Sequence, residues 1–264
     1  MLRFSVIWRK MFDLDNMKSE TVTDRVNDGI VLTQRTKGLK FGTDALLLAA
    51  YMPEQKKPIR AAELGSGTGI ISLLALQRKK AETVFAYEIQ ESYAQLTAFN
   101  AAQNGMADKL SVICKNIKDA SPADCGGELD AVFSNPPYMA LGAGLHCTEG
   151  EKDIARREIC GTAADFAAAA SRLLKWGGTF YCVYRPERVA TLICAMKDAR
   201  LEPKKLTFVY EHPEAEPCLV LCAARKGSGE GVTVTRPLYL RKDKASSEYT
   251  PEAQAIYDGK PLEL

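Results

Sequence analysis

The stretch Asn135–Pro136–Pro137–Tyr138 combines residue types that can hold an amino nitrogen for reaction. An amino group on an aromatic ring or an acyl group is a poor nucleophile, because its lone pair is delocalised. The Asn135 side-chain oxygen and the Pro136 carbonyl can accept its two N–H bonds and shift electron density onto the nitrogen. The paired prolines restrict the backbone and so pre-position both acceptors. Tyr138 can stack on a planar base.

A second group of residues forms a glycine loop, Glu63–Gly69, with the sequence ELGSGTG between a predicted strand and a predicted helix. Glycines allow a tight turn and let a ligand approach the backbone at the helix N-terminus. The spacing G-x-G-x-G differs from the dinucleotide fingerprint G-x-G-x-x-G. Glu63 is unfavourable beside a pyrophosphate but suits a cationic amino-acid group. Glu88 ends the next predicted strand, where its carboxylate can accept both hydroxyls of a ribose.

Together, these residues resemble the class I S-adenosylmethionine-dependent methyltransferases. The resemblance implies that S-adenosyl-L-methionine is the cofactor and that Glu88 holds its ribose. It also implies a contact to the adenine amino group from the residue after the third strand, which is Asn116, with Asp119 as the alternative. The methionine part of the cofactor would lie on Glu63, Gly65, Ser66, Gly67 and Gly69.

The Asn135–Tyr138 stretch follows the fourth predicted strand and resembles a known amino-methyltransferase motif. That motif, (Asp, Asn or Ser)-Pro-Pro-(Tyr, Phe or Trp), occurs in adenine, N2-guanine and glutamine methyltransferases. The resemblance implies catalysis by Asn135, Pro136, Pro137 and Tyr138, with Asn135 also beside the cofactor. Neither a cysteine nucleophile nor a metal ion is expected, because the sulfonium is an activated donor. A target base would have to leave its stack to enter the site.

Longer segments are similar to the bacterial tRNA(Val) adenine-N6 methyltransferase family, which modifies the adenine beside the anticodon. They include QRTKGLKFGTDALLLAAYM, SNPPYMALGAG and the closing EYTPEAQAIY. This resemblance implies an RNA substrate, tRNA, and places the group Phe41–Gly42–Thr43–Asp44 over the cofactor pocket, with Phe41 and Thr43 at the cofactor. For each of these residues singly, an ordinary helix start capped by Thr43 is about as good an explanation. The segment Arg185–Arg188 could face RNA phosphates; the alternative is a helix cap in which Glu187 suits the helix dipole.

Several other functions fit the same motifs. The same transfer could act on N2 of an rRNA guanine, on a protein glutamine or on a DNA adenine; the last is disfavoured because no separate DNA-recognition domain is evident. A non-catalytic RNA-binding module is a different class, and the intact Asn135–Tyr138 stretch argues against it. The glycine spacing and Glu63 disfavour a nicotinamide-dependent oxidoreductase.

The elements that position these residues follow a β–α repeat, which predicts an α/β, doubly wound, Rossmann-like fold. Strands are predicted at Ile59–Leu64, Thr83–Glu88, Leu110–Cys114, Leu129–Ser134, Thr179–Tyr184, Lys205–Tyr210 and Cys218–Ala224. Helices are predicted at Gly69–Lys79, Glu91–Gln103, Thr162–Lys175 and Pro186–Ala199. The link 211–217 is too short for a crossover helix. We therefore predict a seven-stranded, mostly parallel sheet whose last strand is antiparallel.

Four segments are expected along the chain. Residues 1–23 are expected to be a disordered N-terminal segment. Residues 24–58 read as a hairpin, turning at Asn27–Gly29, and a helix at Thr43–Tyr51 that packs over the cofactor site. Residues 59–226 form the methyltransferase domain of the resemblance, and residues 227–264 form a C-terminal extension with a short helix from Thr250 to Tyr257. The segment 140–160, rich in glycine and charge, is a candidate substrate loop.

Composition excludes several classes of protein. The chain has 264 residues, 46% of them hydrophobic, and a net charge of +2, so a polyanion would have to bind local basic clusters. Its eight cysteines form no Cys-x-x-Cys pair and only two histidines accompany them, so no metal site is expected. Free thiols without a secretory signal suggest the cytoplasm. No apolar run is long enough for a membrane span. The oligomeric state cannot be inferred from the sequence.

Overall fold

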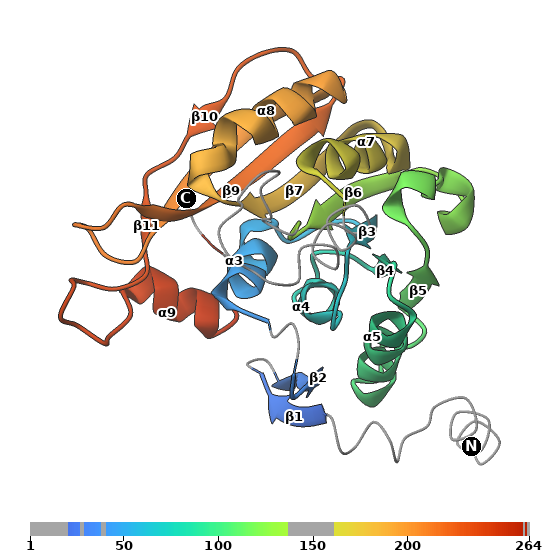
Figure 1. The fold of residues 1–264 in the computed structure, drawn as a ribbon, viewed down its shortest axis with the longest axis horizontal. Helices are drawn as coiled ribbons and strands as arrows, with labels where there is room; N and C mark the ends of the chain where they lie inside the picture. Colours follow the sequence, from blue (N-terminus) through green and yellow to red (C-terminus); the bar gives the residue numbers. More distant parts are fainter. Residues whose placement is uncertain (1–20, 27–28, 38–40, 137–160, 261, 263–264) are drawn as a thin grey trace, which may run out of the picture.

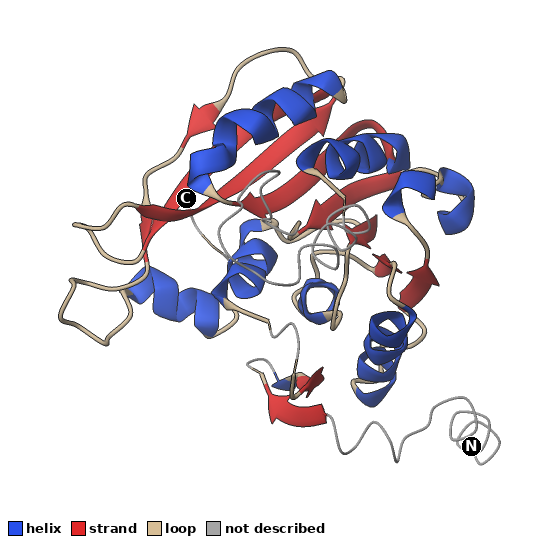
Figure 2. Ribbon diagram, in the orientation of Figure 1, coloured by secondary structure: helices blue, strands red, loops and turns tan. Residues whose placement is uncertain are grey.

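A single large sheet with helices on both faces lies at the centre of the computed structural model (Figure 1). The structure describes residues 21–26, 29–37, 41–136, 161–260 and 262. The helices and strands keep the alternation that the sequence predicted (Figure 2). The predicted substrate loop at residues 140–160 lies outside the described residues.

The seven predicted strands form a sheet in the order β5-β4-β3-β6-β7-β9-β8. Their bounds are β3 Arg60–Leu64, β4 Thr83–Glu88, β5 Leu110–Cys114, β6 Leu129–Ser134, β7 Leu174–Tyr184, β8 Leu201–Tyr210 and β9 Pro217–Lys226. Every neighbour pair among them is parallel except the two that involve β9, which runs antiparallel to β7 and β8. The doubly wound, Rossmann-like fold with an antiparallel last strand is thereby confirmed.

The sheet is larger than predicted, because two short strands extend its outer edge. β10 (Thr233–Val234) and β11 (Leu238–Tyr239) both pair with β8, which gives a 9-stranded sheet where seven strands were expected. Strands this short carry no alternation pattern, so a periodicity argument cannot find them. Both come from the segment after residue 226, which therefore packs against the sheet.

Helices cover the two faces of the sheet unequally. α7 (Ala163–Leu173) and α8 (Val189–Asp198) lie on one face, and α3 (Thr43–Tyr51), α4 (Ile70–Gln77) and α5 (Glu91–Gln103) lie on the other (Figure 1). Alternate residues of a strand serve the two cores: Val132 packs with α7 and α8, and its neighbour Phe133 packs with α3 and α4. This alternation follows from the pleat of a strand buried on both faces.

Several predicted boundaries were wrong: β3 and α4 are shorter than predicted, and β7, β8 and β9 are longer. α7 begins at the predicted cap, where Thr162 and Asp165 form a capping box, but it ends at Leu173 rather than Lys175. β7 starts at once at Leu174, and its register against β6 shifts before Thr179. A Cβ at Gly178 would lie 3.0 Å from the carbonyl oxygen of Asp130, so this irregularity needs a glycine. The predicted helix at Pro186 begins with a 3-10 turn, Pro186–Arg188, before α8.

The N-terminal hairpin is present and packs beside α5. β1 (Thr21–Arg25) pairs antiparallel with β2 (Val31–Arg35), so the hairpin starts earlier than residue 24, where it was expected. Thr21–Thr23 therefore lie in a strand, and residues 1–20 are outside the described part of the chain. The division of the chain at residues 58 and 226 stays a prediction.

Two asparagines, Asn100 of α5 and Asn104 directly after this helix, take the place of a neighbouring strand for β2. The Asn104 side chain accepts the backbone N–H of Val31 at 2.8 Å and donates to the carbonyl of Val31 at 2.7 Å. Asn100 does the same for Thr33, at 2.9 and 3.0 Å. A side-chain amide has the same donor and acceptor as a peptide group, so each asparagine satisfies one residue of the strand. These bonds attach the hairpin to the helix that follows β4.

The C-terminal extension returns to α3. The predicted C-terminal helix is present as α9 (Pro251–Tyr257), with Thr250 as its cap rather than its first residue. The Tyr257 hydroxyl lies 3.0 Å from the Thr43 hydroxyl at the start of α3. No helix in the described part of the chain is long and apolar enough to cross a bilayer. Among the same residues, no group of three or more His, Cys, Asp and Glu side chains is placed to hold a metal ion.

We expect Asn104→Ala to loosen the hairpin locally. Two hydrogen bonds to Val31 would be lost, which corresponds to about 1–3 kcal/mol of local stability. Hydrogen exchange of the Val31 amide should become faster, with little change in the unfolding of the sheet. The control is Gln95→Ala, because the Gln95 amide bonds to Glu91 within α5. Unchanged protection of Val31 in Asn104→Ala would show that the asparagine does not hold β2.

Candidate active site

The predicted site residues converge at the carboxyl edge of the sheet, because the strands that precede them are parallel and in register. Leu64 of β3 lies opposite Tyr87 of β4 and Ser134 of β6. Glu88 lies opposite Cys114 at the end of β5. The glycine loop, Glu88, Asn116 and Asn135 therefore follow neighbouring strand ends. This edge is where open α/β sheets bind their ligands.

The glycine loop has a conformation that side chains would oppose. Gly65, Gly67 and Gly69 have φ of +74°, +55° and +79°, which L-residues rarely adopt. A Cβ at Gly69 would lie 2.7 Å from the Thr97 side chain. A Cβ built at Gly67 meets no atom within 4 Å, so the space above the loop is open to a ligand. The loop thus fits the cradle that a cofactor needs.

The Glu88 carboxylate fixes the backbone of the glycine loop. Its two carboxylate oxygens accept the backbone N–H groups of Gly67 and Gln90, each at 2.9 Å. The side chain is buried, with 6% of its surface exposed, so its orientation is restricted. A carboxylate oxygen can accept more than one hydrogen bond, so these contacts leave capacity for ribose hydroxyls. The predicted position of Glu88 at the end of β4 is confirmed.

Two residues of α5 support the loop and were not predicted. The Thr97 hydroxyl donates to the carbonyl of Gly67 at 2.9 Å, and its oxygen lies 3.3 Å from the Ser66 hydroxyl. Asn100 donates to the carbonyl of Thr68 at 2.8 Å while it also binds β2. Thr97 and Asn100 of α5, with Asn104 directly after this helix, recur at helical spacing. This polar stripe in a helix that must pack on the sheet is the signal that could have identified them.

Glu63 is buried in the core rather than exposed at the surface of the site. It is 1% exposed, and one carboxylate oxygen accepts the backbone N–H of Ser72 at 3.0 Å and also the Ser72 hydroxyl. Burial raises the pKa of Glu63 from 4.5 to about 8, the Ser72 bonds oppose that shift, and the charge of Glu88 adds to it. Glu63 therefore caps the first turn of α4. Its predicted contact with a cationic group stays a prediction.

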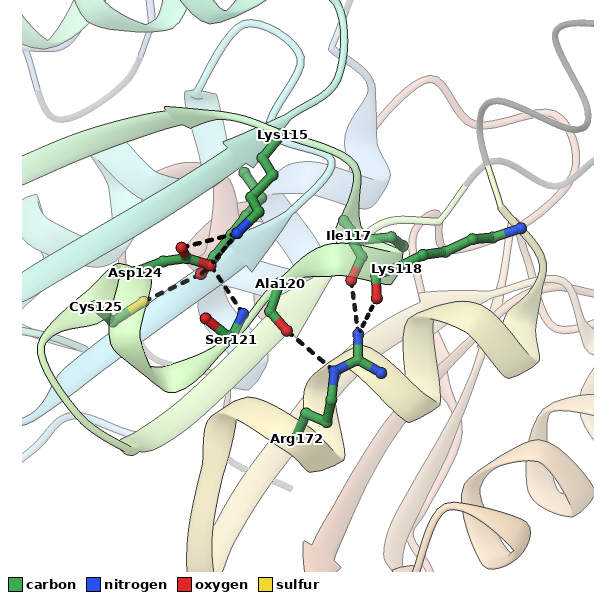
Figure 3. A network of polar contacts seen from close by, with 9 residues as sticks. Lys115, Ile117, Lys118, Ala120, Ser121, Asp124, Cys125 and Arg172 are labelled. Atoms are coloured by element: carbon green, nitrogen blue, oxygen red, sulfur yellow. Dashed lines mark hydrogen bonds and ion pairs between the residues drawn. The ribbon is translucent and has the colours of Figure 1, made fainter.

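The loop after β5, which carries Asn116, is fixed by a polar network (Figure 3). Arg172 of α7 donates to the carbonyls of Ile117, Lys118 and Ala120 at 2.9–3.0 Å. Lys115 pairs with Asp124 at 2.8 Å, and this bond, followed by that from the Ser121 N–H, lowers the pKa of Asp124 below its usual value. These contacts hold the loop against α7 and within itself.

Asn116 itself caps a short 3-10 turn. Its side-chain oxygen accepts the backbone N–H of Lys118 at 3.0 Å, so only its second lone pair is left for an adenine amino group. Asp119, the alternative residue, is exposed. The adenine contact stays a prediction for either residue.

Asn135 contacts the start of α3. Its amide nitrogen donates to Asp44 at 2.8 Å, a bond between residues 91 positions apart in the chain. Pro136 is buried, whereas Pro137 and Tyr138 lie outside the described residues. Phe41, three residues before Asp44, is partly buried against the core. Its backbone N–H donates to the Gln34 side chain at 3.1 Å. The predicted group Phe41–Asp44 therefore reaches the end of β6 through Asp44.

Comparisons with known proteins agree with this arrangement. The methyltransferase small domain family matches residues 36–198. A tRNA1(Val) (adenine(37)-N6)-methyltransferase of Enterobacter sp. is 30% identical over 222 residues, which span 83% of this chain and 88% of the relative. One of the same name from Bacteroides fragilis is 28% identical over 77% of this chain and 92% of its own length.

The fold has a solved counterpart. The crystal structure of a predicted O-methyltransferase from Agrobacterium tumefaciens superposes with a TM-score of 0.67 at 23% identity, and covers 83% of this chain and 98% of that one. At this identity the likeness concerns the fold alone. The chain belongs to the methyltransferase small domain family. It is an S-adenosylmethionine-dependent methyltransferase.

We expect Glu88→Ala to weaken binding of S-adenosylmethionine by about 1–3 kcal/mol, because a charged acceptor for the ribose and the anchor of Gly67 are both lost. Isothermal titration calorimetry measures this change. Glu82→Ala is the matched control, since Glu82 is exposed just before the same strand. Equal affinities for the wild type and Glu88→Ala would remove Glu88 from the cofactor site.

Glu63 should make stability depend on pH. Its pKa is raised on folding from 4.5 to about 8 by burial, so the folded state binds its proton more tightly than the unfolded chain. The contribution of Glu63 to stability should therefore be full below pH 4.5 and fall as pH rises towards 8, by an amount on the order of 5 kcal/mol. Glu63→Gln should lack this fall.

Urea unfolding of both proteins at pH 5 and pH 8.5 measures the difference. As pH rises, the free energy of unfolding of Glu63→Gln should increase relative to that of the wild type. Parallel pH profiles would mean that the buried carboxyl is not protonated in the folded state.

Proposed function

We propose that the protein transfers a methyl group from S-adenosylmethionine to N6 of an adenine in tRNA, in the anticodon loop. The observation that carries this proposal is Asn135, whose amide is held by Asp44 at the strand end beside the glycine loop. The relatives support the target, since they are tRNA1(Val) (adenine(37)-N6)-methyltransferases matched over most of their length. A tRNA substrate also fits a cytoplasmic location.

Cofactor binding would use groups at the ends of β3, β4 and β5. Glu88 would accept the ribose hydroxyls, and the backbone of Gly65–Gly69 would lie against the methionine part. Asn116 would face the adenine. S-adenosylmethionine supplies a methyl group that is already activated on a sulfonium, so the chain needs to position the acceptor rather than activate the donor.

Catalysis would depend on two oxygen acceptors. The Asn135 side-chain oxygen and the Pro136 carbonyl would each accept one N–H of the target amino group, which aims the nitrogen and stabilises the positive charge that develops on it. S-adenosylmethionine would supply the methyl group: the held nitrogen would bond to the methyl carbon as the sulfur–carbon bond breaks, S-adenosylhomocysteine would leave, and the nitrogen would lose a proton to solvent. Pro137 would keep this backbone rigid, and Tyr138 would stack on the extruded base.

Transfer to another amino group is the second candidate, because the same two acceptors also suit N2 of an rRNA guanine, a protein glutamine or a DNA adenine. The deciding experiment uses isotopically labelled S-adenosylmethionine with unmodified total tRNA, followed by digestion to nucleosides and mass analysis. Labelled N6-methyladenosine supports the proposal. Labelled N2-methylguanosine would keep the chemistry and overturn the base. No label in tRNA would contradict the proposed substrate.

In the same assay, we expect Asn135→Ala to lower turnover by at least ~100-fold, the usual effect of removing one group that stabilises the transition state. Affinity for S-adenosylmethionine should stay within a few-fold, because the side chain mainly orders the acceptor. Calorimetry provides that control. Full activity of Asn135→Ala would remove Asn135 from the mechanism.

A further inference from the structure

We infer that Asp44 is a positioning residue, which sets the orientation of the Asn135 amide. Because of this contact, catalysis requires asparagine rather than aspartate at position 135. This inference rests on the proposed amino-methyl transfer and adds a residue that the predicted motif does not contain. It concerns a contact between two elements, the start of α3 and the end of β6.

The contact selects one of two amide orientations. The Asn135 amide nitrogen lies 2.8 Å from one carboxylate oxygen of Asp44. An ionised carboxylate only accepts hydrogen bonds, so it can pair with the NH₂ end of the amide but not with the oxygen end. Rotating the amide by half a turn would place two oxygens against each other. Asp44 therefore fixes the direction in which the Asn135 oxygen points.

Asp44 is itself held in place. Its other carboxylate oxygen accepts the backbone N–H of Ala45 at 2.9 Å, in the first turn of α3, where a negative charge is favoured. Gly42 lies against the same oxygen: a Cβ there would be 2.9 Å from it. The backbone of Gly42 is ordinary, with φ of −117°. A side chain at position 42 would therefore displace the Asp44 carboxylate from this position.

This geometry distinguishes asparagine from aspartate at position 135, the first residue of the motif. Aspartate at position 135 would place two carboxylates within hydrogen-bonding distance, which disfavours the ionised pair. Exchanging both residues restores an amide–carboxylate pair with its polarity reversed. Asn at position 44 would donate to one oxygen of Asp at position 135, and the second oxygen would remain to accept from the target amino group.

The test is a four-protein exchange: wild type, Asn135→Asp, Asp44→Asn and the double variant, each assayed for kcat with labelled S-adenosylmethionine and tRNA. We expect Asn135→Asp to lower kcat by at least ~100-fold. The double variant should recover at least ~10-fold over Asn135→Asp, with cofactor affinity unchanged within about threefold throughout. An active Asn135→Asp, or a double variant no better than it, would overturn the inference.

Asp130→Asn is the matched control. Asp130 lies at the other end of β6, where it accepts the N–H of Arg60 at 2.9 Å and pairs with Lys175. This variant should lose stability without a change in kcat. A fall in kcat equal to that of Asp44→Asn would mean that general loss of stability, and not the orientation of Asn135, explains the effect.

A spectroscopic readout separates this inference from the proposed function. In ¹⁵N–¹H spectra, the Asn135 side-chain amide, assigned from its loss in Asn135→Ala, should lie downfield of an ordinary asparagine amide. In Asp44→Ala and Gly42→Ala, the signal of this amide should move to the chemical shift of an ordinary asparagine amide. If the amide signal does not respond, the inference fails even with an active enzyme. If it responds while tRNA is not methylated, the positioning role stands and the proposed substrate fails.

Discussion

The site depends on how Glu88 satisfies the backbone of the glycine loop. Three residues of the loop have left-handed backbone conformations, and glycine loses more conformational freedom on ordering than other residues. The Glu88 carboxylate compensates by accepting the N–H of Gly67 and of Gln90. The carbonyl of Tyr87 accepts the N–H groups of Gly65 and Ser66 at 2.9 and 3.0 Å. The end of β4 therefore orders the loop that follows β3 before a ligand arrives.

The same edge carries two buried acids, and the contact of either one with a cationic group stays a prediction. Glu63 and Glu88 are 1% and 6% exposed, and the charge of Glu88 contributes to the raised pKa of Glu63. A ligand with positive groups would relieve this unfavourable pair, whereas a pyrophosphate would add to it. Electrostatics and glycine spacing thus point to the same cofactor, and family membership agrees with both.

Local signals in the sequence predicted the elements around the site closely. β4, β5, β6 and α5 match their predicted bounds, because each run ends at or directly before a polar residue: Glu88, Lys115, Asn135 and Asn104. Features that depend on distant contacts were missed. The end of α7 depends on pairing of Leu174 with Leu129 across the sheet, and the Asn100 and Asn104 bonds to β2 depend on where the hairpin packs. The Asp44–Asn135 contact joins two segments that no local pattern relates. The roles of Pro137 and Tyr138 stay predictions.

The most direct test is a crystal structure with S-adenosylhomocysteine and an RNA stem-loop that contains the target adenine. The account predicts the ribose hydroxyls on Glu88, and the adenine N6 at about 3 Å from both the Asn135 side-chain oxygen and the Pro136 carbonyl. The Asn135 amide nitrogen should still donate to Asp44. An adenine N6 held by other groups, or an Asn135 amide turned with its nitrogen towards the base, would contradict the account.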